Sequence, residues 1–300
     1  MDTCAPTSTR RLLGIDWGTS NRRAYLVDAA GTRLAERADD QGMLAARPDF
    51  AGSFARLLAA MDVDADVPVV ASGMVGSAQG WRDIPYLDIG VPLEALPDCL
   101  VCIDDPRAGR PCLIVPGYAQ RGAHVDVMRG EETQLLGAVA LGRRDGWFVL
   151  PGTHSKWVLV EDGIMRRIAT FMTGELFATL SAHGTLAPLM TGDDDDAAFV
   201  AGLDEARLGA PLSNALFGVR ARVVTGAMPA AQARSFVSGL LVGAEFVAAG
   251  RAAPLTCIGS PALQARYARA AGHFGVTLAG LDPDRVYCAA LARFLDRIPS

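Results

Sequence analysis

The chain has 300 residues, of which 50% belong to the apolar set and 20% are charged. This length suits roughly two domains of about 150 residues, and the apolar fraction excludes a disordered or low-complexity chain. The formal net charge is only −5 and the basic residues are scattered, which excludes a nucleic-acid tract and a polybasic membrane face.

The first eleven residues are polar and lack the apolar core of a secretory signal. No later segment reaches the roughly 18 continuous apolar residues that a membrane span needs. We therefore expect a cytoplasmic protein whose partners include neither a membrane nor a nucleic acid.

Three consecutive strands are predicted next, over residues 12–16, 22–28 and 32–37. The first ends at Asp16, and the polar turn Gly18-Thr19-Ser20-Asn21 follows it. Such a turn directs main-chain N–H groups and short hydroxyls toward one point, as a phosphate chain requires, and its glycine permits close approach. A carboxylate beside phosphates suits a hydrated Mg²⁺, so Asp16 is a candidate metal ligand.

The same order of strands and turns returns 134 residues later, with strands predicted over 147–150, 156–160 and 164–171. Gly18-Thr19 then falls on Gly152-Thr153 and Arg22 on Lys156, whereas Asp16 falls on Leu150. This internal repeat predicts two related halves that hold one ligand from opposite sides, with the carboxylate in one copy only.

Two residues of the second turn have open roles. Lys156 is the only lysine of the chain, and it is either a point charge near the phosphates or a solvent-facing strand residue. His154 either donates to phosphate or caps the turn.

Between and after these strands, apolar residues at helical spacing predict helices, and short apolar runs predict further strands. The run Asp193–Asp196 is interpreted as a solvated helix start. The whole order predicts two α/β lobes with mixed sheets. The helices are expected over 50–61, 175–182, 198–208, 235–249 and 285–297, and the strands over 67–71, 99–103, 112–115 and 255–258.

The six cysteines are irregularly spaced, which is typical of a reducing compartment rather than of a disulfide framework. Cys99 and Cys102 form a C-x-x-C pair inside the strand predicted over 99–103. Residues i and i+3 of a strand face opposite sides, so we expect buried cysteines there and no metal site.

A glycine-rich loop follows the strand over 67–71 and is a candidate for binding a small polyol. It offers N–H donors, hydroxyls and aromatic walls, although its glycines would also be explained by a tight turn alone. A carboxylate substrate would need a cation as well, and the sequence does not choose among Arg82, Arg110, Arg121 and Arg129. The candidate loop residues are Ser72, Gly73, Met74, Gly76, Trp81 and Tyr86.

Asp16–Ala24 resembles the first phosphate motif of sugar kinases in the acetate and sugar kinase, chaperone and actin superfamily, and Gly152-Thr153 resembles the second. Thr256–Leu263 resembles the adenosine motif, except that Ser260 stands where many members have a second glycine. The resemblance implies two ribonuclease-H-like lobes with an ATP cleft between them, and nucleotide contacts from Gly259 and Ser260.

More specific stretches resemble the 2-dehydro-3-deoxygalactonokinase family over nearly the whole chain. This resemblance implies ATP-dependent phosphorylation of the C6 hydroxyl of 2-dehydro-3-deoxy-D-galactonate in galactonate catabolism. A kinase for another sugar acid or amino sugar, and a nucleotide-switch module that is not a kinase, stay as alternatives, and a homo-oligomer is left open. The stretches are Ser72–Ser77, Gly80-Trp81, Pro85-Tyr86, Asp126–Gln134, Pro151–Trp157 and Thr170–Glu175.

The resemblance also implies roles for single residues. In such kinases the general base stands about twenty residues before the second phosphate turn, at a helix start after a glycine, which implies Glu131, with Asp126 as the alternative. Either acid would also be explained as a helix N-terminal acid. Arg23 matches the arginine of the first phosphate hairpin, and Arg22 should face the other side of its strand. The implied cofactors are ATP and Mg²⁺.

The expected lobes follow from this assignment. The first comprises residues 1–118 plus 283–300, with the first phosphate motif and the sugar-acid loop. The second comprises residues 119–282, with the base, the second phosphate motif and the adenosine motif.

Overall fold

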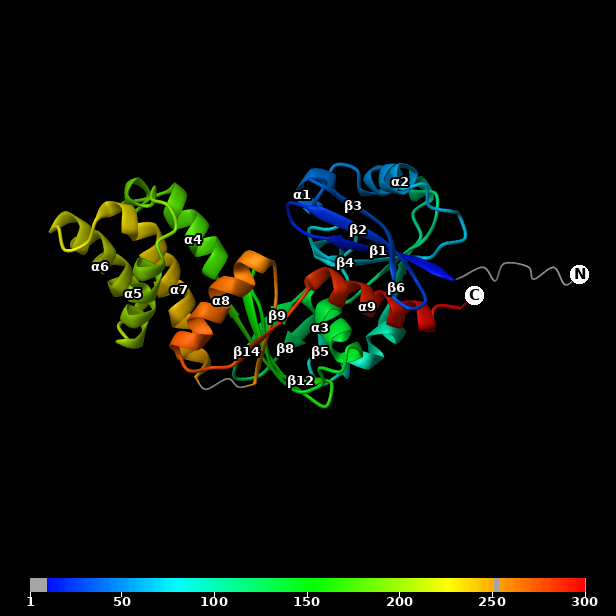
Figure 1. Ribbon diagram of the computed structural model, residues 1–300. Coiled ribbons are helices and arrows are strands. Elements are labelled where there is room, and N and C mark those ends of the chain that lie inside the picture. The colour runs from blue at the N-terminus through cyan, green and yellow to red at the C-terminus, as the bar shows by residue number, and fades with distance from the viewer. Residues whose placement is uncertain (1–9, 251–253, 300) are drawn as a thin grey trace, which may run out of the picture. The chain divides into compact units, whose positions relative to one another are not determined.

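The computed structural model describes residues 10–250 and 254–299, so Cys4 lies outside the described residues. The chain forms two compact units (Figure 1). The first contains the chain up to Asp145, Val160–Arg167 and the segment from Pro283 onward, and the second contains Gly146–Leu159 and Ile168–Asp282.

The first unit is built on a six-stranded sheet whose strand order is β3-β2-β1-β4-β7-β6. Strands β1 and β2 pair antiparallel, as do β2 and β3, whereas β1 pairs with β4, and β4 with β7, in parallel. The predicted three-strand meander is therefore confirmed. The bounds are β1 Arg11–Trp17, β2 Arg22–Asp28, β3 Arg33–Asp39, β4 Val69–Gly73, β6 Val101–Ile103 and β7 Cys112–Ile114.

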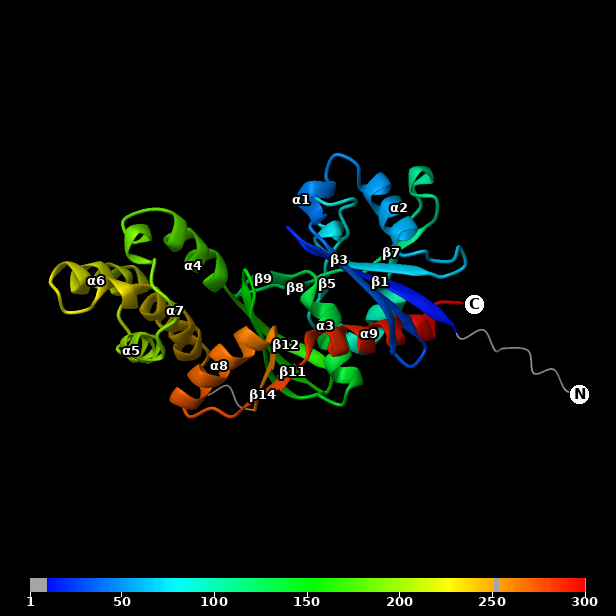
Figure 2. The same cartoon turned by 45° about the horizontal axis from the view of Figure 1, so that its top comes forward.

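Helices cover both faces of this sheet (Figures 1 and 2). Ile15 and Trp17 of β1 share one buried apolar cluster with Phe54 of α2. On the opposite face, Gly14 lies against Leu291 of α9, where a Cβ would meet the leucine side chain at 2.3 Å. The helices of this unit are α1 Met43–Ala46, α2 Phe50–Ala60, α3 Glu131–Ala140 and α9 Pro283–Arg297, with 3₁₀ turns at Met74–Gly76, Leu93–Cys99 and Pro106–Ala108.

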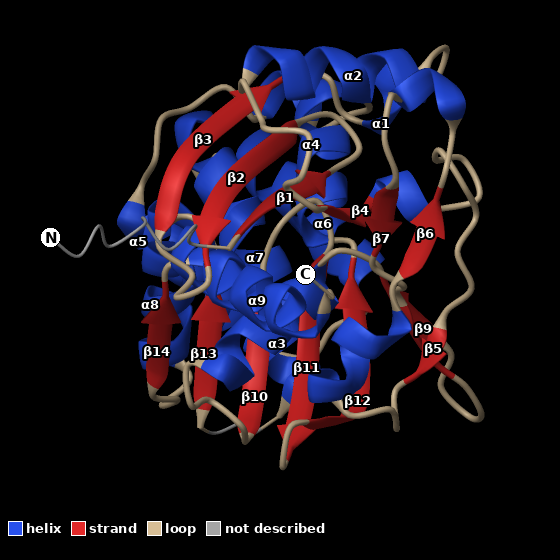
Figure 3. Cartoon of the chain, turned by 90° about the vertical axis from the view of Figure 1, so that its right-hand side faces the viewer, coloured by secondary structure: helices blue, strands red, loops and turns tan. Residues whose placement is uncertain are grey.

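The second unit is built on a sheet with the strand order β12-β11-β10-β13-β14, visible in Figure 3. The helices of this unit pack around α7, which contacts α5 closely at two glycines. A Cβ on Gly202 would lie 2.1 Å from the carbonyl oxygen of Phe236, and a Cβ on Gly239 would lie 2.0 Å from the carbonyl oxygen of Phe199. The strands are β10 Gly146–Leu150, β11 Ser155–Glu161, β12 Ile164–Phe171, β13 Leu255–Ile258 and β14 Leu278–Leu281. The helices are α4 Thr173–Ala182, α5 Asp196–Arg207, α6 Leu212–Val224, α7 Ala233–Ala249 and α8 Pro261–His273, with 3₁₀ turns at Ala187–Leu189 and Ala230–Gln232.

The five strands of the second sheet repeat the arrangement of five strands of the first, which has β6 as an additional edge strand. In each, three consecutive strands are followed by two strands in parallel with the first, β4 and β7 in one and β13 and β14 in the other. The internal repeat is therefore confirmed as a repeat of the fold, and the expected pair of ribonuclease-H-like α/β lobes with mixed sheets is confirmed with it.

Some boundaries differ from the sequence analysis. Cys99 ends a 3₁₀ helix and only Cys102 lies on β6, so the strand predicted over 99–103 was too long. The expected burial of the two cysteines was also wrong, because Cys99 is half-buried and Cys102 is exposed at this edge of the sheet. The compact units also keep residues 119–145 with the first unit, whereas we expected them in the second lobe. The packing gives the reason, because Gly137 of α3 approaches the carbonyl oxygen of Val286 on α9 so closely that a Cβ would lie 1.8 Å from it.

A small sheet was not predicted. It has the order β5-β8-β9 and comprises β5 Leu87–Asp88, β8 Tyr118–Gln120 and β9 Asp126–Met128, strands too short to show a sequence period. None of the helices in the described residues is both long and apolar enough to span a membrane.

Candidate functional site

The end of β1 sets the orientation of the two neighbouring arginines. Asp16 stands directly opposite Arg23 in the β1 and β2 pair, and Trp17 stands opposite Arg22. Because side chains alternate along a strand, Asp16 and Arg23 share one face and Arg22 takes the other. The predicted division of the two arginines is confirmed.

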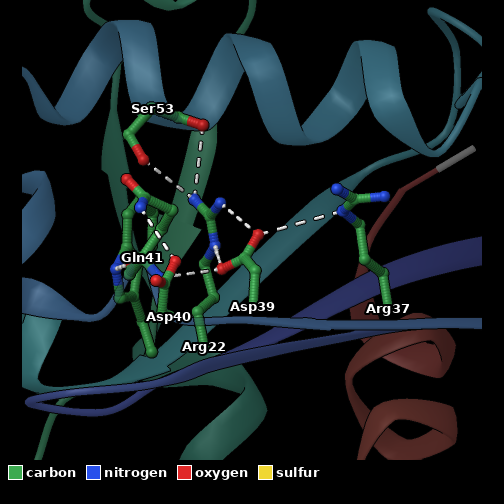
Figure 4. Close-up of polar contacts among 7 residues, drawn as sticks. Arg22, Arg37, Asp39, Asp40, Gln41 and Ser53 are labelled. Carbon is green, nitrogen blue, oxygen red and sulfur yellow. Dashed lines mark hydrogen bonds and ion pairs between the residues drawn. The ribbon is translucent and has the colours of Figure 1, made fainter.

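Arg22 is buried and has a full set of partners (Figure 4). Its Nε and Nη2 donate to the two carboxylate oxygens of Asp39 at 3.1 and 2.8 Å, and its Nη1 donates to Ser53 Oγ at 3.1 Å. The guanidinium also lies 4.9 Å from the centre of the Trp17 ring. Arg22 therefore ties β2 to β3 and α2, and it is not available for a ligand.

Asp16 has an unusual electrostatic environment. Burial, followed by the negative charge of Glu131 and, less strongly, of Asp284, raises the pKa of Asp16 to about 6, and Arg23 opposes this shift. Arg23 itself is more than half exposed and lies 3.6 Å from Asp284 Oδ1. The folded chain thus brings Asp16, Arg23 and Glu131 into one neighbourhood, together with Asp284, an acid that the sequence analysis missed.

The first predicted phosphate turn is short, and the start of α1 packs against its backbone and supports it. The Gly18 amide donates to the Asn21 carbonyl at 3.0 Å, and the Met43 amide at the start of α1 donates to the Gly18 carbonyl at 2.8 Å. Gly42 contacts the turn so closely that a Cβ would lie 2.3 Å from the carbonyl carbon of Ser20. The side chains of Thr19, Ser20 and Asn21 remain exposed.

The second predicted phosphate turn has the same brace. Gly174, in the first turn of α4, would place a Cβ 2.2 Å from the Gly152 carbonyl oxygen, and the Glu175 amide donates to the Thr153 carbonyl at 2.8 Å. His154 Nε2 lies 2.7 Å from Glu175 Oε2. In both units, then, the helix after the third strand fixes the turn between the first two.

The flank of this second turn is anchored by Glu245 of α7, a buried carboxylate that the sequence analysis did not select. Glu245 accepts hydrogen bonds from Ser155 Oγ, Trp157 Nε1 and the Tyr267 hydroxyl, each at 2.7 Å, and also from Thr173 Oγ1. Burial raises the pKa of Glu245, while these donors hold it down. One carboxylate thus joins β11, α4, α7 and α8.

Lys156 does not face solvent. It is buried, and its Nζ donates to Thr170 Oγ1 at 2.9 Å. The interpretation of Lys156 as a solvent-facing strand residue is therefore wrong. Strand β11 is buried on both faces: Trp157 donates a hydrogen bond to Glu245 of α7, and Lys156, on the opposite face of the strand, is buried as well.

The predicted adenosine motif forms a strand, a turn and a helix start, as expected. Ser260 has a negative φ of −59° and caps α8 by accepting from the Leu263 amide at 3.4 Å, so this position does not require a glycine. A cavity of about 120 Å³ lies within the same unit. Its mainly apolar lining includes Gly152, Phe177, Leu241, Leu263, Arg266 and Tyr267.

The candidate base stands at a helix start after a glycine. Gly130 precedes α3 with φ of +113°, a value that favours glycine, and a Cβ there would lie 3.3 Å from the Gly73 Cα. This close approach sets Glu131 beside the end of β4, the neighbour of β1. Glu131 is partly buried and accepts from the Arg129 amide at 3.2 Å.

The two neighbouring acids differ from Glu131. Glu132 is fully buried, and both its oxygens accept from the Gly130 amide at 2.8 and 2.7 Å. Burial, and then the charge of Glu131, raises its pKa to about 8. Asp126 lies on β9, where its Oδ1 accepts from the Val127 amide at 2.7 Å, so it is not a helix N-terminal acid.

The candidate sugar-acid loop begins inside the core. Ser72 is buried, and its Oγ lies 2.9 Å from the hydroxyl of Tyr287 on α9. Gly73 has φ of +91° and opens the 3₁₀ turn that contains Met74 and Gly76. The Trp81 ring packs 5.4 Å from Phe54, a core contact that the sequence analysis did not predict.

The four candidate arginines differ in their exposure and in their partners. Arg82 is exposed, and Arg121 is exposed and lies 3.6 Å from Asp88. Arg110 donates to the carbonyls of Asp64 and Val67. Arg129 is buried, lies with its guanidinium 4.3 Å from the Tyr86 ring centre, and borders the sugar-acid loop.

Comparisons with known proteins agree with each other. A family model described as 2-keto-3-deoxy-galactonokinase matches residues 16–294. The chain is 34% identical over 294 residues to the 2-dehydro-3-deoxygalactonokinase of Escherichia coli (strain K12), covering 94% of this chain and 97% of that one. It is 37% identical over 290 residues to DgoK1 of Rhizobium meliloti (strain 1021), a protein assigned the same activity, with 93% and 94% covered. A crystal structure of a Sinorhizobium meliloti protein given that assignment has a TM-score of 0.87, 35% identity and coverage of 94% and 95%.

Proposed function

Because the chain belongs to the 2-keto-3-deoxy-galactonokinase family, we propose that it transfers the γ-phosphoryl group of ATP to the C6 hydroxyl of 2-dehydro-3-deoxygalactonate. Family membership makes it a sugar-acid kinase, a phosphotransferase that acts on an alcohol group. The nucleotide, the metal ion, the reacting hydroxyl and the residue roles are our proposal, as is a place in cytoplasmic galactonate catabolism.

ATP is proposed to contact both braced turns and the cavity of the second unit. Gly18, Thr19, Ser20 and Asn21 present an exposed polar turn whose backbone is held from behind, which suits a phosphate chain. Gly152 and Thr153 form the corresponding turn of the second unit, with His154 beside it. The apolar cavity next to Gly152 and Tyr267 suits a nucleoside, with Gly259 and Ser260 at the start of α8.

Asp16 is the residue that would hold Mg²⁺. A half-buried carboxylate with a raised pKa, set among further carboxylates, gains from a nearby cation. Mg²⁺ commonly uses one or two protein carboxylates plus water and phosphate oxygens. When bound, the ion would neutralise charge on the phosphates. Arg23, on the same face, is proposed to contact phosphate. Lys156 is buried beside the second turn, which contains Gly152 and Thr153. A contact between the Lys156 ammonium group and phosphate is also a proposal.

Glu131 is proposed as the general base. It would accept the proton of the C6 hydroxyl as this oxygen attacks the γ-phosphorus. The position at a helix start, beside Gly73 and within electrostatic range of Asp16, supports Glu131 over Asp126, whose carboxylate accepts from the amide of its own strand. The loop residues Ser72, Gly73, Met74, Gly76, Trp81 and Tyr86 are proposed to surround the sugar acid.

The observation that carries the proposal is that Asp16 and Glu131 both lie at the end of β4. Asp16 stands beside Ser72 in the β1 and β4 pair, and Gly130, which precedes Glu131, lies against Gly73. A nucleotide-switch module needs no second carboxylate at this place, whereas a kinase needs both a metal ligand and a base. The test is ADP release with a panel of sugar acids and amino sugars. We expect 2-dehydro-3-deoxygalactonate to stimulate ADP release strongly. If ADP release with this sugar acid is no faster than the background hydrolysis of ATP without it, the assignment is overturned.

A further inference from the structure

Arg129 holds a buried positive charge that is only partly satisfied. About 9% of the residue is exposed, and its Nη2 donates to the Ile84 carbonyl at 2.6 Å. Within the described residues, its Nε and Nη1 have no hydrogen-bond partner. Three N–H groups of a buried guanidinium therefore lack an acceptor.

Among residues 10–250 and 254–299, no carboxylate forms an ion pair with this guanidinium. Glu132 is close enough for Arg129 to lower its pKa, but both oxygens of Glu132 accept from the Gly130 amide, and no ion pair joins the two side chains among the described residues. Unpaired buried charges are strongly unfavourable, so a cation kept in this state calls for an anionic ligand.

The surroundings of Arg129 are those of the sugar-acid loop. Ile84 accepts from Nη2, the Tyr86 ring lies against the guanidinium, and a Cβ on Gly76 would lie 2.9 Å from Nη1. Because Gly76 has no side chain, the Arg129 guanidinium can occupy this position. The proposed base, Glu131, stands only two residues further along the chain.

We propose that Arg129 is the residue that binds the carboxylate of the sugar acid. The inference rests on the proposed function and names the group that selects an acid over a neutral sugar. Guanidinium and carboxylate form strong charge-assisted hydrogen bonds, which would satisfy the free N–H groups. The segment 129–131 would then hold the acid end of the substrate and take the proton from its alcohol end.

The test compares 2-dehydro-3-deoxygalactonate with its uncharged C1 carboxamide. In the unmodified enzyme, kcat/KM should be about 100-fold higher for the acid than for the carboxamide, because the carboxamide loses a charged hydrogen bond at a buried site. Arg129→Gln should reduce this preference to within a few-fold, mainly by raising KM for the acid, while KM for ATP and kcat change little. Arg121→Gln, an identical substitution at an exposed arginine, should keep the preference.

A second variant separates carboxylate binding from a role in folding. Arg129→Lys keeps the charge without the planar guanidinium, and it should retain part of the preference for the acid. An Arg129→Gln enzyme that keeps the full preference, an Arg121→Gln enzyme that loses it, or equal losses for both substrates in Arg129→Lys would each overturn the inference alone. Failure of the unmodified enzyme to turn over the acid would instead overturn the proposed function.

Discussion

Asp16 and Arg23 face each other directly across the β1 and β2 pair, so that a carboxylate with a raised pKa and an arginine share one face of the sheet. The pKa of Asp16 is about 6, raised by burial and by Glu131. Asp16 must be ionised to hold a cation, so kcat/KM should fall as the pH drops through about 6. A pH profile of kcat/KM measures this acid limb.

Arg23 provides the matched variant for that profile. Because Arg23 lowers the pKa of Asp16, Arg23→Gln should move the acid limb to higher pH and also raise KM for ATP. Asp16→Asn should reduce kcat/KM by at least about 100-fold at every pH, as removal of a key electrostatic group does. An acid limb that stays in place in Arg23→Gln would contradict the coupling between the two side chains.

The base assignment makes a second prediction. Glu131→Gln should lower kcat by about 100-fold or more while ATP binding stays intact, because the amide cannot accept the hydroxyl proton. Asp126→Asn is the control of the same kind, and it should keep most of the turnover. Rapid-quench measurement of the chemical step with both variants decides between them, and the reverse pattern would assign the base to Asp126.

Glu132 should make stability depend on pH. Its pKa in the folded protein is about 8, above the ordinary 4.5, so the folded chain keeps a proton that the unfolded chain has already released. The free energy of unfolding should therefore fall as the pH rises from about 4.5 to 8. Glu132→Gln, which mimics the protonated acid, should flatten this slope, whereas exposed Glu161→Gln should not. Urea unfolding across the pH range gives the measurement.

Glu245 should be a major source of stability in the second unit. Glu245→Ala leaves the buried donors Ser155, Trp157 and Tyr267 without their acceptor, which should lower the free energy of unfolding by about 3 kcal/mol or more. Glu161→Ala, which removes an exposed partner of Arg166, should change it by less than about 1 kcal/mol. Similar losses in the two variants, measured by urea unfolding, would show that the buried network is not special.

The glycine brace of the second turn can be tested with one methyl group. Gly174→Ala should raise KM for ATP by about 10-fold or more, because the Cβ would meet the Gly152 carbonyl oxygen and displace the turn. Gly272→Ala, on α8, meets no atom within 4 Å and should leave KM unchanged. Unaltered kinetics in Gly174→Ala would mean that the turn does not bind the phosphates.

The sequence predicted those features that depend on local pattern. Alternating apolar strands and polar turns revealed both meanders and their repeat. The helix start at Glu131 was implied by the family resemblance and not by the local pattern. Side-chain alternation also separated Arg22 from Arg23.

The features that the sequence did not reveal depend on contacts between distant segments. Glu245 lies in an ordinary apolar helix, and only the folded chain brings its four donors together from β11, α4 and α8. Asp284 reaches Arg23 across some 260 positions of the chain because α9 returns to the first sheet. Lys156 was left open for the same reason, since the pattern of β11 alone does not show that the fold buries both faces of this strand.

The central claim is phosphoryl transfer to C6 of a sugar acid, and the structure of the product tests it most directly. The enzyme is incubated with ATP, Mg²⁺ and 2-dehydro-3-deoxygalactonate, and the purified product is analysed by NMR for coupling between phosphorus and the sugar protons. The account predicts one phosphomonoester coupled to the two C6 protons, with Glu131→Gln forming it far more slowly. A phosphate ester at a hydroxyl other than that of C6, or ADP formed without any phosphorylated sugar acid, would contradict it.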